Sequence, residues 1–167
     1  MIAASRGIRR FFFPELTTGF FIRIGFVAFS AYLFFGYACL PFWIQGASME
    51  PTYRDGEFHF CWKGRYLFSE PKRYEVVAIR LAGSRIMLLK RIVALEGEEI
   101  EFRDGKLYVN GEEIEEPYVR YRRNWNLPLR RVEKGNVFVV GDNRGVDMDN
   151  HYLGQAARLR IIGGPLW

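Results

Sequence analysis

The chain has 167 residues and a formal net charge of +5, and 49% of its residues are hydrophobic. This length leaves room for one domain. Residues 1–23 carry four arginines against one glutamate, so only +2 of the net charge belongs to the remainder. A nearly neutral remainder excludes the strongly basic pattern of a nucleic-acid-binding protein, and we expect no nucleic-acid partner.

The first predicted element is a transmembrane helix over residues 24–44. These residues carry no charge and are rich in Phe, Ala, Leu and Tyr. About 20 apolar residues are enough to cross a bilayer as a helix. Pro41 lies near the end of the run, where a helix can stop, and Trp43 suits the membrane interface. Residues 1–23 before it form a basic segment that can lie along the other interface.

The charges on the two sides of this span predict its orientation. Arginines dominate the segment before it, whereas the first charges after it are Glu50, Arg54 and Asp55. The positive-inside rule then places the N-terminus in the cytoplasm and residues 45–167 outside the cell inner (plasma) membrane, as a single-pass protein. A cleaved signal peptide is the alternative, but the apolar run exceeds the roughly 7–15 residues of such a core.

Beyond Thr52 the sequence predicts strands. Asp104-Gly105 and Asn110-Gly111 are typical hairpin turns, and no amphipathic helical pattern of good length follows the span. The expected strands cover residues 58–62, 74–81, 86–95, 98–103, 106–109, 112–114, 137–140 and 157–162. Residues 45–167 are therefore expected to form one extracytoplasmic domain that is mainly β, with antiparallel sheets or a partly closed barrel.

Cysteine and histidine residues are few. Cys39 falls in the expected span and Cys61 in the outer domain, so we predict no disulfide. His59 and His151 have no zinc-ligand spacing, and we predict no metal site. Neither histidine lies in an evident triad context, although the sequence alone does not exclude either one as a base.

Ser48 and Lys90 are the candidate pair for hydrolytic chemistry. Ser48 lies just after the apolar run, and Lys90 lies among apolar residues. A serine hydroxyl is a weak nucleophile until a base takes its proton. Lysine can be that base only when neutral, which requires its pKa to fall by about three units from roughly 10.4. Burial in an apolar strand has this effect, whereas a lysine that extends to solvent would stay charged.

Three segments occur in a recognisable order: residues 48–52, 90–98 and 141–154. Together they resemble the type I signal peptidases, which are membrane-bound Ser-Lys serine endopeptidases, and the resemblance covers residues 44–154. It implies a β-rich catalytic domain with its active site beside the membrane. It also implies preproteins with signal peptides as substrates and no metal or cofactor.

The resemblance implies roles for individual residues. Ser48 would be the nucleophile and Lys90 the general base, and the Ser48 backbone N–H would stabilise the oxyanion. Ile44 and Leu89 would line the substrate pocket, which accepts small side chains at positions −1 and −3. Supporting or structural roles fall on the other motif residues: Gly46, Met49, Pro51, Arg91, Asp142, Asn143, Asp147 and Asp149.

Two departures from the family pattern lie near the expected dyad. Gly46 stands where some members carry a serine whose hydroxyl aids the oxyanion hole, so the backbone donor remains. Asp147 stands where members usually carry a serine that orients the lysine. A carboxylate close to Lys90 would favour its ammonium form, and we therefore expect Asp147 to point away.

A third departure is His151, which replaces an arginine that pairs with the family aspartate. Asp149 must then find another partner, for which Arg91 and Arg144 are the candidates. We expect Asp142 and Asp149 to stabilise the sheet around the site rather than to take part in the chemistry.

The segment 117–131 is rich in arginine, and its part 117–128 is interpreted as a modest insertion. It is either a solvated loop or a contact for anionic lipid headgroups. Its arginines are Arg120, Arg122, Arg123, Arg130 and Arg131, interleaved with Tyr121, Trp125 and Leu127.

The leading functional hypothesis is a signal peptidase that acts on exported preproteins. Its expected partners are signal peptides, the lipid bilayer and the secretion translocon, and we expect a monomer. One alternative keeps the fold but matures a dedicated pilin or conjugation protein. The other, which Asp147 suggests, is a non-catalytic, membrane-anchored binding module.

Overall fold

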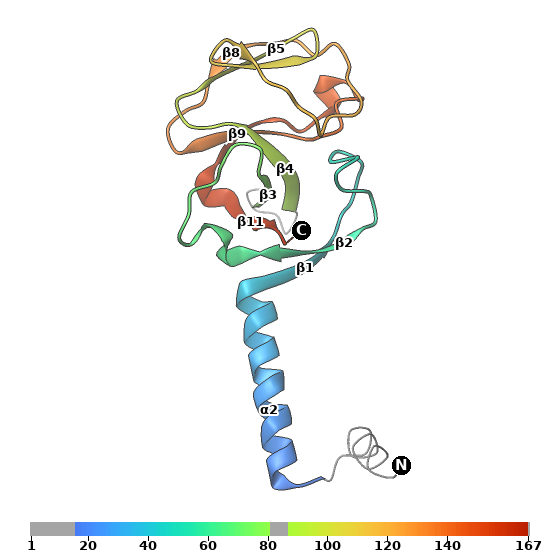
Figure 1. Ribbon diagram of the computed structural model, residues 1–167, viewed down its shortest axis with the longest axis vertical. Coiled ribbons are helices and arrows are strands. Elements are labelled where there is room, and N and C mark those ends of the chain that lie inside the picture. Colours follow the sequence, from blue (N-terminus) through green and yellow to red (C-terminus); the bar gives the residue numbers. More distant parts are fainter. Residues whose placement is uncertain (1–15, 81–86, 167) are drawn as a thin grey trace, which may run out of the picture. The chain divides into compact units, whose positions relative to one another are not determined.

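The computed structural model describes residues 16–80 and 87–166 and separates the chain into two units, residues 1–38 and 39–167. The first unit is an apolar helix, α2 (Thr18–Leu33), that continues as one π-helical stretch, η1 (Phe34–Ala38) (Figure 1). The Thr17 side chain accepts a hydrogen bond from the Phe20 N–H and caps its N-terminus. The 21 residues from Thr18 to Ala38 are long and apolar enough to cross a membrane.

This helix lies six residues earlier than the run 24–44 that the lack of charge had indicated. Arg23 lies inside this helix. The helix can tolerate the charge, because a long side chain close to a helix end can carry it to the interface. The last residues of the run form strand β1 (Cys39–Trp43) instead. An uncharged aromatic window does not distinguish a helix from a strand, and Pro41 is tolerated because β1 is an edge strand.

The second unit is built from two open antiparallel sheets, which confirms the predicted mainly β class (Figure 1). The larger sheet has seven strands in the order β1-β2-β11-β3-β4-β9-β10. Its further strands are β2 (Phe58–Trp62), β3 (Val76–Arg80), β4 (Met87–Ala94), β9 (Asn136–Val140), β10 (Gly154–Ala157) and β11 (Ile161–Pro165). The smaller sheet, β7-β6-β5-β8, comprises β5 (Glu99–Arg103), β6 (Lys106–Val109), β7 (Glu112–Glu113) and β8 (Leu127–Arg131).

One buried cluster joins the two sheets. Val93 and Val140 from the larger sheet pack with Ile100, Phe102 and Leu107 from the smaller sheet. Phe102 alone removes on the order of 150 Å² or more from water. This shared core fixes the smaller sheet against β4 and β9, and these are the two strands that lead into the site.

Two strand predictions need correction. Residues 157–162 do not form one strand: β10 ends at Ala157, a 3-10 turn (Arg158–Arg160) follows, and β11 begins at Ile161. Strand β8 was not predicted, because Pro128 and two arginines hide its alternation. Ends of the predicted strands 74–81 and 86–95 fall at residues 81 and 86, outside the described residues.

The two cysteines are closer than their assignment to span and outer domain had suggested. Cys39 pairs with Trp62, and Leu40 pairs with Cys61, on the neighbouring strands β1 and β2. Successive side chains of a strand point to opposite faces, so this register turns the two thiols to opposite sides of the sheet. Both thiols are buried and free.

Candidate active site

Lys90 lies in the interior of the larger sheet. Strand β4 holds it between two neighbours, with Val77 opposite Lys90 on β3 and Val140 opposite Arg91 on β9. Only 2% of Lys90 is exposed. Burial lowers its pKa from 10.5 to about 8, with Asp142 opposing the shift and Arg144 adding to it. The apolar surroundings that the sequence indicated thus give a lysine that is partly neutral near physiological pH.

Ser48 lies in the loop between β1 and β2. Two backbone bonds close the base of this loop, from the Ile44 N–H to the Glu57 oxygen at 2.9 Å and from the Gly56 N–H to the Ile44 oxygen at 2.9 Å. Gly46 has a φ of +89°, a conformation that suits glycine. In the part of the chain that the structure describes, no group accepts the Ser48 backbone N–H, which leaves it available as a donor.

The segment after β9 holds this loop from the other side. The Asn143 backbone N–H donates to the Ser48 carbonyl oxygen at 3.1 Å, and the Asn143 side-chain amide donates to the Ala47 carbonyl oxygen at 3.0 Å. Residues almost 100 positions apart in sequence are thereby fixed to each other. Asn143 had been assigned only a general supporting role, and these two bonds define it.

Gly141 connects Ser48 with Lys90. The pairing of Arg91 with Val140, continued by one residue, puts Gly141 beside Lys90. A Cβ atom on Gly141 would lie only 2.2 Å from the backbone carbonyl oxygen of Ser48 and 2.5 Å from the His151 Nε2. The backbone of the Ser48 loop and the strand that carries Lys90 therefore both adjoin this glycine, and only a residue without a side chain fits between them.

Asp142 ties the same loop to β4. Its carboxylate is fully buried and accepts bonds from the Arg91 Nε at 2.8 Å and Nη2 at 2.6 Å. It also accepts the Thr52 hydroxyl at 2.5 Å. These bonds use both carboxylate oxygens, so Asp142 anchors the loop that carries Ser48.

A second buried ion pair was not anticipated. The Arg144 Nη2 donates to Glu116 at 2.6 Å, with 2% and 0% of the two side chains exposed. The Arg144 Nε donates to the Gly141 oxygen at 2.7 Å, and its guanidinium lies over Phe102 and Trp125. No sequence pattern links these ion-pair partners, because Glu116 belongs to the segment that precedes β8.

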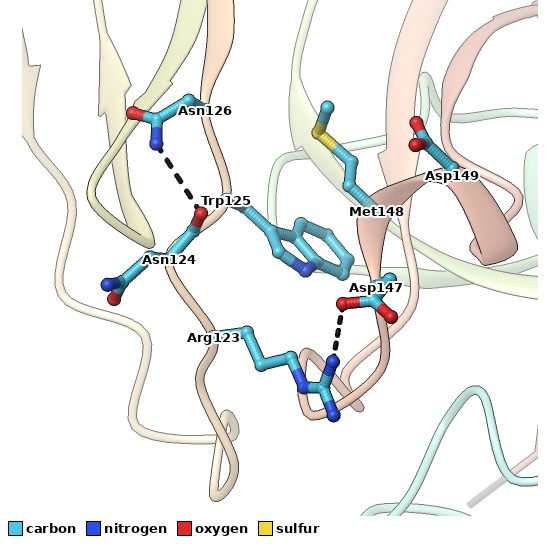
Figure 2. A pocket seen from close by; sticks show the side chains of 7 residues that line it. All are labelled: Arg123, Asn124, Trp125, Asn126, Asp147, Met148 and Asp149. Atoms are coloured by element: carbon cyan, nitrogen blue, oxygen red, sulfur yellow. Dashed lines mark hydrogen bonds and ion pairs between the residues drawn. The ribbon is translucent and has the colours of Figure 1, made fainter.

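Asp147 points away from Lys90, as expected. It forms an ion pair with Arg123, and both side chains are more than half exposed (Figure 2). Asp147 is absent from the charges that shift the pKa of Lys90. Asp149 is also exposed, so the expectation that it pairs with Arg91 or Arg144 is wrong. Those two arginines are engaged by Asp142 and Glu116.

The two histidines have different environments. His151 is 8% exposed, and its Nε2 accepts the Gly141 N–H at 3.0 Å. Burial, with Lys90 and Arg144 nearby, lowers the pKa of His151 to about 3, so its ring is neutral. His59 lies 3.2 Å from the Glu57 carboxylate, and its ring packs against Tyr53. Neither ring is bonded to Ser48 in the structure.

A cavity of about 430 Å³ opens beside Ser48. Ile44 and Leu89, the residues expected at the substrate pocket, both line it, together with Ala78 and Met87. Met49 contributes to its wall and is 1% exposed. The cavity is thus mainly apolar, and Ser48 is one of the residues that line it. In the described ranges, no group of three or more His, Cys, Asp or Glu residues is arranged to hold a metal ion.

The chain is similar to known proteins. The sequence matches the family described as signal peptidase, peptidase S26, over residues 17–165. The chain belongs to this family. It is therefore a serine endopeptidase of the S26 class, anchored in the membrane by its N-terminal helix, and the sequence-based recognition of the family is confirmed.

Its relatives include well-known bacterial enzymes. Signal peptidase I T of Bacillus subtilis (strain 168) is 36% identical over 134 residues, which cover 74% of this chain and 69% of the relative. Signal peptidase I of Bacillus amyloliquefaciens is 35% identical with the same coverage. The crystal structure of a signal peptidase I from Enterococcus faecalis V583 is 27% identical, covers 57% of this chain and 97% of its own, and has a TM-score of 0.48.

Proposed function

We propose that this signal peptidase cleaves signal peptides from exported preproteins with Ser48 as nucleophile and Lys90 as general base. The observation that carries the assignment is the burial of Lys90 beside Gly141, the residue against which the Ser48 loop is packed. A lysine with a pKa of about 8 is neutral in roughly one molecule in ten at pH 7.

The proposed reaction uses only these groups. The neutral Lys90 amine takes the Ser48 hydroxyl proton as the oxygen attacks the scissile carbonyl. The Ser48 backbone N–H stabilises the oxyanion. The Lys90 ammonium then protonates the leaving amine, which leaves an acyl-enzyme, and the amine form activates the water that hydrolyses the ester.

The substrate would bind as an extended chain along the apolar cavity. The small side chains that the family resemblance implies just before the cleavage site would lie in this cavity of about 430 Å³, next to Ile44 and Leu89. An extended peptide can add backbone bonds along a strand edge.

The domain boundaries and orientation are part of the proposal. The excess of arginine before the helix supports a cytoplasmic N-terminus and a β unit outside the plasma membrane. β1 follows the helix without a linker, because Cys39 comes directly after Ala38. A short connection of this kind suits an enzyme whose substrate still has its signal peptide in the bilayer.

The test is cleavage of a preprotein with small residues at −1 and −3 by full-length protein in detergent. Ser48→Ala and Lys90→Ala should each abolish cleavage. Ser69→Ala and Lys134→Ala are matched controls, since both residues are exposed, and should cleave normally. Cleavage retained by either dyad variant would overturn the assignment. The exposed ion pair of Asp147 also removes the observation that favoured a non-catalytic module.

A further inference from the structure

A second hollow, of about 560 Å³, lies beside the nucleophile loop. Its walls include three arginines, Arg120, Arg122 and Arg123, with the Tyr121 ring and the Asn143 side chain. We call it the arginine hollow. Within the described part of the chain, none of the residues that line it is acidic. It contains most of the arginine-rich motif for which the dyad chemistry provides no role.

Backbone bonds fix the arginine hollow to the active site. The Arg123 N–H donates to the Arg144 oxygen at 3.1 Å, and Arg122 forms a parallel bridge with Arg144. The neighbouring Asn143 donates its backbone N–H to the Ser48 carbonyl oxygen at 3.1 Å. The arginine segment is therefore bonded to Arg144, the residue that follows Asn143, and Asn143 is bonded to Ser48.

Two of the three arginines keep most of their donors free for a ligand. Arg123 is paired with Asp147. Arg122 donates one weak bond, from Nη2 to the Glu116 oxygen at 3.4 Å, and Arg120 lies over the Tyr121 ring at 5.7 Å. A guanidinium has five N–H donors, and Arg120 and Arg122 are both exposed. Both residues line the hollow, and Arg122 also lies near the Glu113 carboxylate, whose pKa it helps to lower.

The two hollows flank the nucleophile. Gly46 and Ser48 line the apolar cavity, whereas Asn143, which bonds to Ala47 and Ser48, lines the arginine hollow. An extended substrate that fills the apolar cavity up to its scissile bond must leave past the Ser48 loop. We infer that the arginine hollow is a subsite for acidic side chains in the first few residues after the cleavage site. This inference rests on the proposed function.

The position of the hollow favours a carboxylate of the substrate over a lipid headgroup. Arginine binds carboxylates and phosphates alike through paired, nearly parallel hydrogen bonds, so the guanidinium groups alone do not decide between them. The Asn143 side chain, which is bonded to the Ala47 carbonyl oxygen and to the Gly145 N–H, lies at the hollow and ties it to the Ser48 loop. Its position next to Ser48 brings every cleaved chain past it, whatever the membrane composition.

The test compares preproteins that differ only after the cleavage site. Residues +2 to +5 carry either two Glu or two Gln, and kcat/KM is measured with full-length protein in a neutral detergent without anionic lipid. The wild type should prefer the Glu substrate by roughly twofold to fivefold for each arginine engaged, and the preference should shrink at high salt. Arg120→Gln and Arg122→Gln should each lower the ratio toward one, and Arg122→Glu should favour a Lys-bearing substrate.

Arg130→Gln with Arg131→Gln is the matched control, because these arginines are equally exposed but lie on β8 outside the hollow. The control should keep the Glu preference. A wild-type ratio of one would overturn the subsite, and so would variants that alter only binding to anionic vesicles, which would assign the arginines to lipid. Binding of the same peptides to Ser48→Ala protein separates the two proposals: a Glu preference in binding, without cleavage by the wild type, would retain the subsite and reject the peptidase.

Discussion

Replacement of Gly141 by alanine tests how closely the site is packed. The added Cβ would lie 2.2 Å from the backbone carbonyl oxygen of Ser48 and 2.5 Å from the His151 Nε2, whereas ordinary van der Waals contacts begin near 3.4 Å. The nucleophile loop must then shift by about 1 Å. A misplacement of about 1 Å can reduce catalysis on the order of 100-fold, and the strain should reduce the free energy of unfolding by roughly 1–3 kcal/mol.

The assay is kcat and KM for preprotein cleavage, with the thermal unfolding midpoint measured on the same samples. Gly163→Ala is the matched control, because its Cβ would lie 2.1 Å from the Trp62 oxygen, an equally severe backbone clash between β11 and β2. Both variants should lose stability, but only Gly141→Ala should lose kcat out of proportion to its folded fraction. Equal kcat per folded molecule in the two variants would refute the idea that Gly141 sets the position of Ser48.

Three further predictions concern the buried charged and polar groups. The cleavage rate should rise with pH through about 8, as Lys90 loses its proton. Lys90→Met should be inactive, because it has no amine, and more stable at pH 7, because it buries no charge. The folded protein binds this proton less tightly than the unfolded chain, so wild-type stability should itself rise between about pH 8 and 10.5, and Lys90→Met should not show this rise in a thermal melt. His151→Ala should lower kcat on the order of tenfold by removing the acceptor of the Gly141 N–H, and His151→Gln should restore most of it; unchanged kinetics in both variants would contradict this role. Glu116→Ala should reduce the free energy of unfolding by about 3–5 kcal/mol, since Arg144 would stay buried without a counter-charge, and Arg144→Met in the same chain should recover part of the loss.

Local patterns were sufficient to predict much of the β fold. The Asp104-Gly105 and Asn110-Gly111 turns gave β5, β6 and β7 almost at their observed bounds, because such turns fix the register of the strands they join. Strands that depend on distant pairing were less visible. β1 and β8 owe their conformation to β2 and β5, which lie elsewhere in the sequence, and their own residues suit a helix end or a polar loop.

The candidate dyad could be proposed from sequence, but its surroundings could not. The apolar residues around Lys90 were compatible with burial but also with a lysine that reaches solvent, and the ordered set of three segments favoured burial. The charges near it are arranged by tertiary contacts, and so the partners of Arg144 and Asp149 were not predictable. Spacing in the chain carries no information on whether Glu116 or Asp149 reaches Arg144, since both carboxylates lie outside the strands.

The arrangement of these charges explains why burial dominates the pKa of Lys90. Desolvation is the largest cause of the shift, and the two nearby charges act in opposite senses: Asp142 raises the pKa of Lys90 and Arg144 lowers it. Asp142 is itself bonded to the Arg91 guanidinium and the Thr52 hydroxyl, and Arg144 is paired with Glu116. A neutral His151 fits the same arrangement, because an additional cation there would have no buried partner of its own.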